Sequence, residues 1–409
     1  MASDQVIWSE QGRLHLAYEG ASVTDAGVIT IASSGTHAVR VGQTIVLSDN
    51  QASPTIIKCY VSAVAADNTT LTVLPYKGAT VGAISGFDTA TDDSGNTCSF
   101  FVYGSEFAKG AGAMSGAVKP EFQSFTNKPI ILKDKFEVNG SDAAQIGWIE
   151  VSGEGGQNGY LWYLKAEGDT RTRFEDYLET ALIESVKGVD ASTIEVELGG
   201  SASNNDPVGS EGLFAAIENR GIVATGAYDA VNDVISDFDL ILKELDKQGS
   251  IEENMLFLDR DSNLKVDDAL AAVNSNWNGG SSFGVFENSE DMALNLGFNG
   301  FRRGSYDFYK TDWKYLNNKS TRGLFADIKG VLVPAGTSSV YDQVLGSNIR
   351  RPFLHVRYRA NEADDRRMKS WITGSVGGAA TSGDDKMEVH YLSERCLVTQ
   401  AANNFVLFK

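Results

Sequence analysis

The sequence has few cysteines, few prolines and no long apolar run. Its 409 residues include only 3 cysteines and 7 prolines. Cys59, Cys98 and Cys396 lie far apart and form no C-x-x-C pair, which argues against a disulfide framework or a zinc site and predicts buried thiols. No apolar run reaches the roughly eighteen residues that a membrane-spanning helix needs. We therefore expect neither disulfides nor a membrane span.

Positive charge is scarce as well. The 35 Lys and Arg residues are outnumbered by 54 Asp and Glu residues, for a formal net charge of -19, and the basic residues occur as scattered pairs. A protein that grips nucleic acid needs clustered Lys and Arg, so any contact with DNA is expected to be indirect. The N-terminus lacks the basic and apolar segments of a secretory signal, which predicts synthesis and use in a cytoplasm.

One segment matches a catalytic motif. Gly280-Ser281-Ser282-Phe283-Gly284 has the G-x-S-x-G pattern of a nucleophile elbow, which would make Ser282 the nucleophile of an acyl hydrolase. A buried strand should lead into that motif, but the polar segment SNWNG precedes it. A glycine-rich loop is the better interpretation, and the hydrolase stays a less favoured alternative.

Metal-binding patterns are incomplete. His15, His37, His355 and His390 stand alone, without the spacing that a metal site needs. The segment that begins at Asp259 starts like a calcium loop but has Leu where the loop requires Gly and Glu. We expect no enzyme activity, no cofactor and no metal.

Short β-branched runs, divided by Gly, Asp, Asn and Ser, dominate the first quarter of the chain. They predict strands at 28–31, 44–47, 55–64 and 70–76. A small all-β module, either a barrel or a sandwich, is therefore expected at 23–103, after an N-terminal arm at 1–22.

The middle of the chain changes character twice. Residues 104–128 are rich in Gly, Ala and Ser, which predicts a flexible linker. Strands are then expected at 129–138 and 146–151, followed by a glycine-rich turn at 153–159 and a returning strand at 160–167. Such a two-stranded excursion is poorly stabilised alone, since no sheet or core covers it.

Helical periodicity begins after this excursion. Asp169 is the predicted N-cap of a helix that ends at Gly188, with Phe174, Leu178 and Leu182 spaced four apart. Further helices are expected at 210–221, 229–248 and 266–274, and strands at 255–259, 353–359, 387–392, 396–400 and 404–408. The mixture predicts an α+β fold.

Three arginine pairs stand out in this acidic chain. They are Arg302-Arg303, Arg350-Arg351 and Arg366-Arg367. An Arg fork can orient one copy of the chain against carboxylates of another. Solvated surface charge is the alternative, because exposed pairs contribute little stability.

The order of these segments resembles the major capsid proteins of tailed bacteriophages, which have the HK97-like fold. Residues 127–151 and 159–179 resemble E-loop and spine-helix segments of capsid proteins from marine and gut phages, and residues 348–378 and 388–408 are similar to the closing segments of that group. The β module at 23–103 is an addition that the minimal fold lacks.

The resemblance implies a division of the chain. It implies an arm at 1–22, the β module at 23–103, a linker at 104–128, an E-loop at 129–166, the spine helix and the start of the P-domain at 167–210, the A-domain at 211–349, and the remaining A-domain with returning P-domain strands at 350–409.

The resemblance also implies a function. Subunits would form hexamers and pentamers of an icosahedral virion head that encloses double-stranded DNA and assembles in the host cytoplasm, with portal, scaffolding or decoration proteins as further partners and no membrane. A virion decoration or glycan-binding protein, built around the β module, is the alternative. The interface candidates are Tyr160, Trp162, Tyr163, Arg171, Arg173, Arg302, Arg303, Arg350, Arg351, Arg366 and Arg367.

Overall fold

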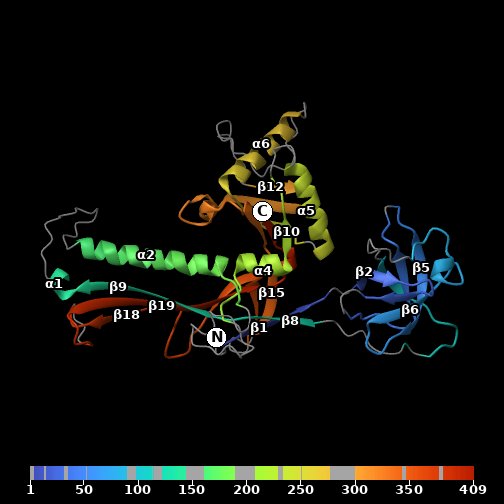
Figure 1. Ribbon diagram of the computed structural model, residues 1–409, viewed down its shortest axis with the longest axis horizontal. Coiled ribbons are helices and arrows are strands. Elements are labelled where there is room, and N and C mark those ends of the chain that lie inside the picture. The colour runs from blue at the N-terminus through green and yellow to red at the C-terminus, as the bar shows by residue number, and fades with distance from the viewer. Residues whose placement is uncertain are drawn as a thin grey trace. The chain divides into compact units, whose positions relative to one another are not determined.

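The computed structural model divides into two compact units. One unit spans Trp8–Phe125, and the other combines Met1–Ile7 with Thr126–Lys409. We call them the barrel unit and the main unit (Figure 1). The structure describes residues 4–12, 15–31, 36–51, 53–89, 98–112, 114, 122–143, 161–188, 208–228, 234–249, 251–276, 300–342, 347–376 and 381–409.

The barrel unit is built on a closed six-stranded barrel in the order β2-β3-β6-β5-β4-β7. Its strands are β2 (Ala17–Val23), β3 (Val28–Thr30), β4 (Gln43–Ser48), β5 (Ile56–Val64), β6 (Thr70–Pro75) and β7 (Cys98–Ser105). A short 3-10 helix, η1 (Val81–Ala83), follows β6. The inward side chains of β3, β4 and β5, such as Ile29, Ile45 and Val61, are fully buried. Alternation of buried and exposed residues along each strand produces this core.

The barrel begins earlier than the sequence predicts. The predicted boundary at residue 23 is wrong, because β2 starts at Ala17 and pairs with both β3 and β7. The segment AYEGASV lacks the β-branched run that marks the other strands, so its strand is held by pairing and by the stacking of Tyr18 on Phe100, whose ring centroids lie 5.2 Å apart.

Two strands lie where an arm and a linker are predicted. These are β1 (Val6–Gln11) and β8 (Phe122–Asn127), which pair with each other as a two-stranded sheet. The division between the two units falls within both strands. The predicted linker at 104–128 therefore contains a strand at its end.

A four-stranded sheet of the main unit is organised around one long strand. β19 (Lys386–Thr399) pairs with β9 (Ile130–Asn139) on one side, and with β18 (Lys369–Gly374) and then β17 (Leu354–Tyr358) on the other. The two strands predicted at 387–392 and 396–400 are thus one strand. Ser393, Glu394 and Arg395 interrupt the apolar pattern but not the pairing, because each has polar partners in the fold.

The helix α2 (Leu161–Glu184) lies along this sheet (Figure 1). With 24 residues it is about 36 Å long. Phe174 and Leu178 pack against Met387, Val389 and Tyr391 of β19. Near its C-terminus, Leu182 joins a second core with α4 (Leu213–Arg220). One helix therefore contributes to two hydrophobic cores.

The start of α2 corrects two predictions. The strand expected at 160–167 is wrong, because residues from Leu161 onward are helical, and Asp169 lies inside the helix instead of capping it. Leu161, Leu164 and Glu167 are good helix formers, and they outweigh the aromatic residues that favoured a strand. β9 pairs with β19, and a short helix, α1 (Gly140–Ala143), follows it. Residues 146–151 and 153–159 lie outside the described residues.

A six-stranded sheet forms the rest of the main unit, in the order β10-β20-β14-β11-β13-β12. Its strands are β10 (Ile222–Ala224), β11 (Glu253–Leu258), β12 (Gly300–Arg303), β13 (Tyr306–Asp312), β14 (Gly330–Pro334) and β20 (Val406–Phe408). β10 with β20 and β11 with β13 are parallel, and the other pairs are antiparallel.

Helices pack on both faces of this sheet. The helices α5 (Val234–Gln248) and α6 (Arg260–Asn276) cover Leu256, Phe308 and Phe408. On the opposite face, α4 packs with Val331 and Leu407. Short elements complete the unit: α7 (Lys314–Asn317), η3 (Arg322–Leu324), η4 (Ala402–Asn404), β15 (Thr337–Asp342) and β16 (Ser347–Pro352).

Candidate functional site

No conventional reaction centre stands out among the described residues. Within them, no group of His, Cys, Asp and Glu side chains could hold a metal ion, and no helix there is long and apolar enough to cross a membrane. The three cysteines are free and buried, and burial raises the pKa of Cys59 and Cys396 to about 12 and that of Cys98 to about 11. These thiols stay protonated at neutral pH and are poor nucleophiles. Ser282 lies outside the described residues.

The most unusual feature of the main unit is a ribbon formed by β15 and β16. The two strands are antiparallel, with Thr337 opposite Pro352 at one end and Asp342 opposite Ser347 at the other. Within the described residues, neither strand pairs with a third strand. We call the strands at 337–342 and 347–352 the ribbon. A two-stranded ribbon without a covering sheet or core is marginally stable in water.

The base of the ribbon is anchored to the main unit. The backbone N–H of Phe353 donates to the carbonyl of Gly336 at 3.0 Å, and the hydroxyl of Ser338 donates to Gln400 at 2.7 Å. Beyond this base, Ser339, Asn348 and Arg350 are exposed. Arg350 makes no hydrogen bond or ion pair with the described residues, so its guanidinium is available to a partner of opposite charge.

The other arginine candidates have partners within the subunit. Arg303 makes a two-pronged ion pair with Asp239, with N–O distances of 2.6 and 2.7 Å, and this pairing holds the pKa of Asp239 below its usual value. Arg302 lies 3.5 Å from Asp307. Arg173 donates to Asp134 at 3.1 Å, and thereby ties α2 to β9.

The pair at 366–367 is also used internally. Arg366 lies 2.8 Å from the buried carboxylate of Glu394, which also binds Arg359 at 2.8 Å. Arg359 in turn binds Asp4, so this cluster joins the N-terminal segment of the main unit to β19. The guanidinium of Arg367 stacks 5.2 Å above the ring of Tyr358.

Of the remaining candidates, the structure describes the two arginines but not the side chains of the three aromatic residues. Arg171 forms an exposed i,i+4 ion pair with Glu175 at 3.1 Å. Arg351 lies in β16 opposite Ser338. Burial lowers the pKa of the half-buried His355, and the positive charges of Arg357 and Arg351 lower it further. Trp162 and Tyr163 belong to α2, but their side chains lie outside the described residues, as does Tyr160.

Sequence reasoning missed a charged cluster on the face of the four-stranded sheet that points away from α2. Lys135 binds Glu137 at 2.8 Å and Glu388 at 3.3 Å, while Lys386 binds Glu388 at 2.7 Å and Glu137 at 3.5 Å. We call these four residues and His390 the open-face cluster. Charged or titratable residues at every second position of 133–137 and 386–390 are the sequence signal for this cluster. The sequence does not show that these two segments pair, so the signal could not be combined into one cluster.

The two carboxylates of this cluster stand directly opposite each other. Glu137 pairs with Glu388 across β9 and β19, an unfavourable arrangement that the two lysines offset. Hydrogen bonds from Lys386 and Lys135 hold the pKa of Glu388 at about 2. His390 lies 3.2 Å from the same carboxylate, and its ring stacks on Trp371.

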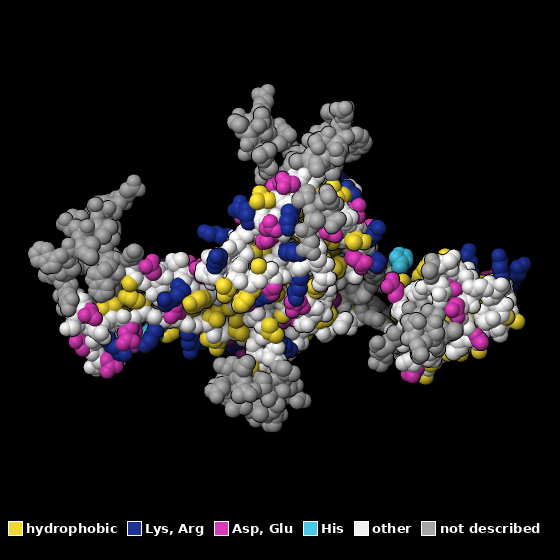
Figure 2. Space-filling view, turned by 45° about the horizontal axis from the view of Figure 1, so that its top comes forward, with side chains coloured by type: hydrophobic (Ala, Val, Ile, Leu, Met, Phe, Trp, Pro, Cys, Tyr) yellow, Lys and Arg dark blue, Asp and Glu magenta, His cyan; other side chains and the backbone are white. Residues whose placement is uncertain are grey.

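The surface charge is mixed and not gathered by sign. Figure 2 shows Lys and Arg interspersed with Asp and Glu over the described surface, with hydrophobic side chains between them. Phosphate binding depends on clustered cations, so this face does not favour a strong nucleic-acid contact.

No protein-family model matches the chain, and no curated protein matches its sequence. Solved structures that resemble it include chains from phages. A chain of the mature capsid of bacteriophage PhiM1 is 9% identical, with 74% of this chain and 77% of that chain covered and a TM-score of 0.38. A chain of the capsid of cyanophage P-SCSP1u is 10% identical, with coverages of 75% and 79% and a TM-score of 0.36.

A chain from Microbacterium phage Oxtober96 is 9% identical, with 100% of this chain and 87% of that chain covered and a TM-score of 0.37. Likenesses this distant do not establish a shared fold or function.

Proposed function

We propose that this chain is a shell-forming structural subunit, the major capsid protein of a tailed phage head. The observation that carries the proposal is the ribbon, since it is anchored only at its base and carries an exposed arginine without an ion pair among the described residues, and it gains stability when a second copy covers it. The sequence resemblance at 127–151, 159–179, 348–378 and 388–408 supports the same conclusion.

The edge strands of the main unit add to this support. Over its ten residues, β9 pairs with β19 on one side, and the described residues include no strand on its other side. Exposed strand edges attract further strands unless something covers or charges them. Lys133 and Lys135 protect β9 from indiscriminate pairing but leave it able to meet a complementary surface.

In this proposal α2 is the spine helix, the four-stranded sheet belongs to the P-domain and the six-stranded sheet belongs to the A-domain. Copies would form hexamers and pentamers around double-stranded DNA, with portal and other head proteins as partners. Arg350 would bind a carboxylate of the adjacent copy, and the surplus of acidic residues supplies many candidates. The barrel is an added module outside this minimal arrangement.

Electron microscopy of the purified full chain tests the proposal. At moderate ionic strength, which screens the repulsion between acidic copies, the chain should form closed shells, rings or tubes. The Ser282→Ala variant should assemble as the unmodified chain does. Hydrolysis of an acyl ester that disappears in this variant, together with a chain that stays monomeric, would instead support the hydrolase alternative.

A further inference from the structure

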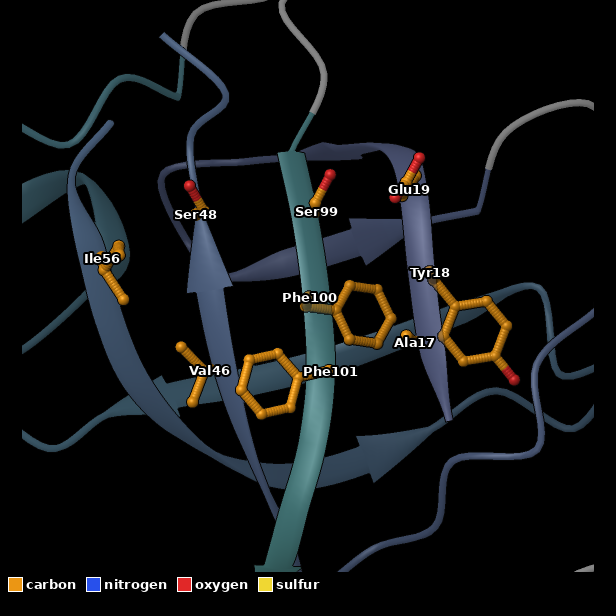
Figure 3. Close-up of a pocket in the computed structure, with 9 residues that line it drawn as sticks. All are labelled: Ala17, Tyr18, Glu19, Val46, Ser48, Ile56, Ser99, Phe100 and Phe101. Atoms are coloured by element: carbon orange, nitrogen blue, oxygen red, sulfur yellow. The ribbon is translucent and has the colours of Figure 1, made fainter. Parts of the chain in front are cut away.

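The outer surface of the barrel carries a depression of about 220 Å³ over β7 and its neighbours (Figure 3). It lies across β2, β4, β5 and β7. Two directly paired rows form its floor, Val46 with Phe101 and Ser48 with Ser99. Its lining residues are Ala17, Tyr18, Glu19, Val46, Ser48, Ile56, Ser99, Phe100 and Phe101.

Apolar side chains are exposed on one side of the depression. Phe101 is 48% exposed and Ile56 is 64% exposed. Positions on the solvent-facing side of a barrel strand are usually occupied by polar residues, so these two apolar side chains are unusual there. In Figure 3 the ring of Phe101 lies beside Val46, between β4 and β7. These residues present an apolar surface with one aromatic ring to solvent, and the barrel core does not include them, since it lies on the inward side of the same strands.

Polar groups lie along the other side. In Figure 3, Ser48, Ser99 and Glu19 lie together at one end of the depression, on β4, β7 and β2. The hydroxyl of Ser99 accepts a hydrogen bond from Asn50 at 2.9 Å, which leaves its proton free to donate. Neither Glu19 nor the hydroxyl of Ser48 has a hydrogen bond or ion pair with a described residue.

We propose that this depression binds a neutral sugar ring, a hexopyranose unit of a glycan. Such a ring has one face of C–H groups, which pack on the Phe101 ring because the π face carries a partial negative charge, and an edge of hydroxyl groups. The carboxylate of Glu19 can accept hydrogen bonds from two of those hydroxyls, while the hydroxyls of Ser48 and Ser99 can donate or accept hydrogen bonds.

Other small ligands fit the chemistry less well. A phosphate or other anion would meet the carboxylate of Glu19, and no lining residue carries a positive charge. A purely apolar ligand would bury the hydroxyls and the carboxylate without partners, at a cost in free energy. A combination of one aromatic surface and a few convergent polar groups is typical of a pocket that orients a ligand of mixed polarity.

The closed barrel makes the depression a prepared site. β4 and β7 pair along their length, so the positions of Ser48, Ser99 and Phe101 are set by backbone hydrogen bonds. Sites built on paired strands hold their geometry better than sites on loops. All nine lining residues belong to the barrel unit, so this inference does not depend on the capsid proposal.

Saturation-transfer NMR on the purified full chain tests the inference, because it detects weak ligands on large particles. The probes are the methyl glycosides of glucose, galactose, mannose and N-acetylglucosamine. We expect at least one to show transfer to the C–H protons of one ring face. The substitution Phe101→Ala should weaken binding about tenfold, and Glu19→Gln should weaken it less.

The matched control is Leu74→Ala, which removes a side chain that is 49% exposed elsewhere on the barrel. It should bind the sugar as the unmodified chain does. Absence of transfer from all four glycosides, or equal affinity in the Phe101→Ala and unmodified chains, would overturn the proposal. Loss of binding in Leu74→Ala to the same degree would also count against it. Unchanged thermal unfolding of each variant shows that the barrel is intact.

Discussion

The barrel unit and the main unit treat the edges of their β-sheets in opposite ways. In the barrel, all six strands pair on both sides, so the sheet closes and leaves no edge. In the main unit, β9 is an edge of the four-stranded sheet and the ribbon stands apart from both larger sheets. The barrel can satisfy its backbone alone, whereas the main unit leaves pairing surfaces that a neighbouring copy can use.

The largest effect should come from the helix that joins the two cores of the main unit. Leu178 of α2 is 3% exposed and packs on β19. We expect Leu178→Ala to lower the free energy of unfolding of the main unit by about 3 kcal/mol. Hydrogen exchange measured by mass spectrometry reports the two units separately, and protection of β4 and β5 in the barrel should not change.

The neighbouring residue provides the control for that measurement. Tyr177 is 53% exposed, so Tyr177→Ala should leave the main unit close to its original stability. Parallel loss of protection in both units after Leu178→Ala would mean that the barrel does not fold independently, and the comparison between the units would fail.

A second substitution acts on the barrel alone. Gly27 has a φ of +83°, and a Cβ atom there would collide with the carbonyl oxygen of Val73. Gly27→Ala should therefore destabilise the barrel by about 2 kcal/mol. Exchange in β5 and β6 should rise while α2 and β19 keep their protection.

Gly112→Ala is the matched control for the barrel, because nothing lies within 4 Å of its added Cβ atom and its backbone angle is ordinary. It should change stability little. Equal destabilisation by both glycine substitutions would show that the close approach at Gly27 is unimportant.

The smallest expected effect concerns the open-face cluster of the main unit. Lys386 is the main cause that holds the pKa of Glu388 at about 2, below the ordinary 4.5. Ionised Glu388 therefore favours the folded state above pH 4.5, and this contribution is lost as the pH falls toward 2. In Lys386→Met, the pKa of Glu388 should rise toward 4.5, which a carbon-13 NMR titration of the carboxyl measures.

Lys133→Met serves as the control, since Lys133 lies on the same strand face as Lys135 but forms no ion pair with the described residues. It should leave the titration of Glu388 unchanged. A pKa near 4.5 in the unmodified chain would show that the open-face cluster does not stabilise the carboxylate.

Local sequence patterns predicted most of the barrel and the helical cores. The β-branched runs at 44–47 and 55–64 became β4 and β5, and the four-residue spacing of Phe174, Leu178 and Leu182 identified the buried face of α2. These elements follow from residue types within a short window.

Elements that depend on distant partners were not predictable. Nothing in TSSVYD or SNIRRP indicated that β15 and β16 form a ribbon, since both segments are largely polar. Arg303 and Arg366 were proposed for contacts between subunits, yet Asp239 and Glu394 bind them within the subunit. The position of a charged residue in the sequence does not reveal which oppositely charged residue lies beside it in the fold.

Sedimentation velocity on two forms of the full chain tests the central claim most directly. In the second form, residues 339–350 are replaced by Gly-Ser-Gly. This replacement keeps the two residue pairs at the base of the ribbon, Thr337 with Pro352 and Ser338 with Arg351. Under assembly conditions the unmodified chain should sediment as large shells and the shortened chain as small, folded species. A stable monomer for the unmodified chain, or equal assembly of the two forms, would contradict the account.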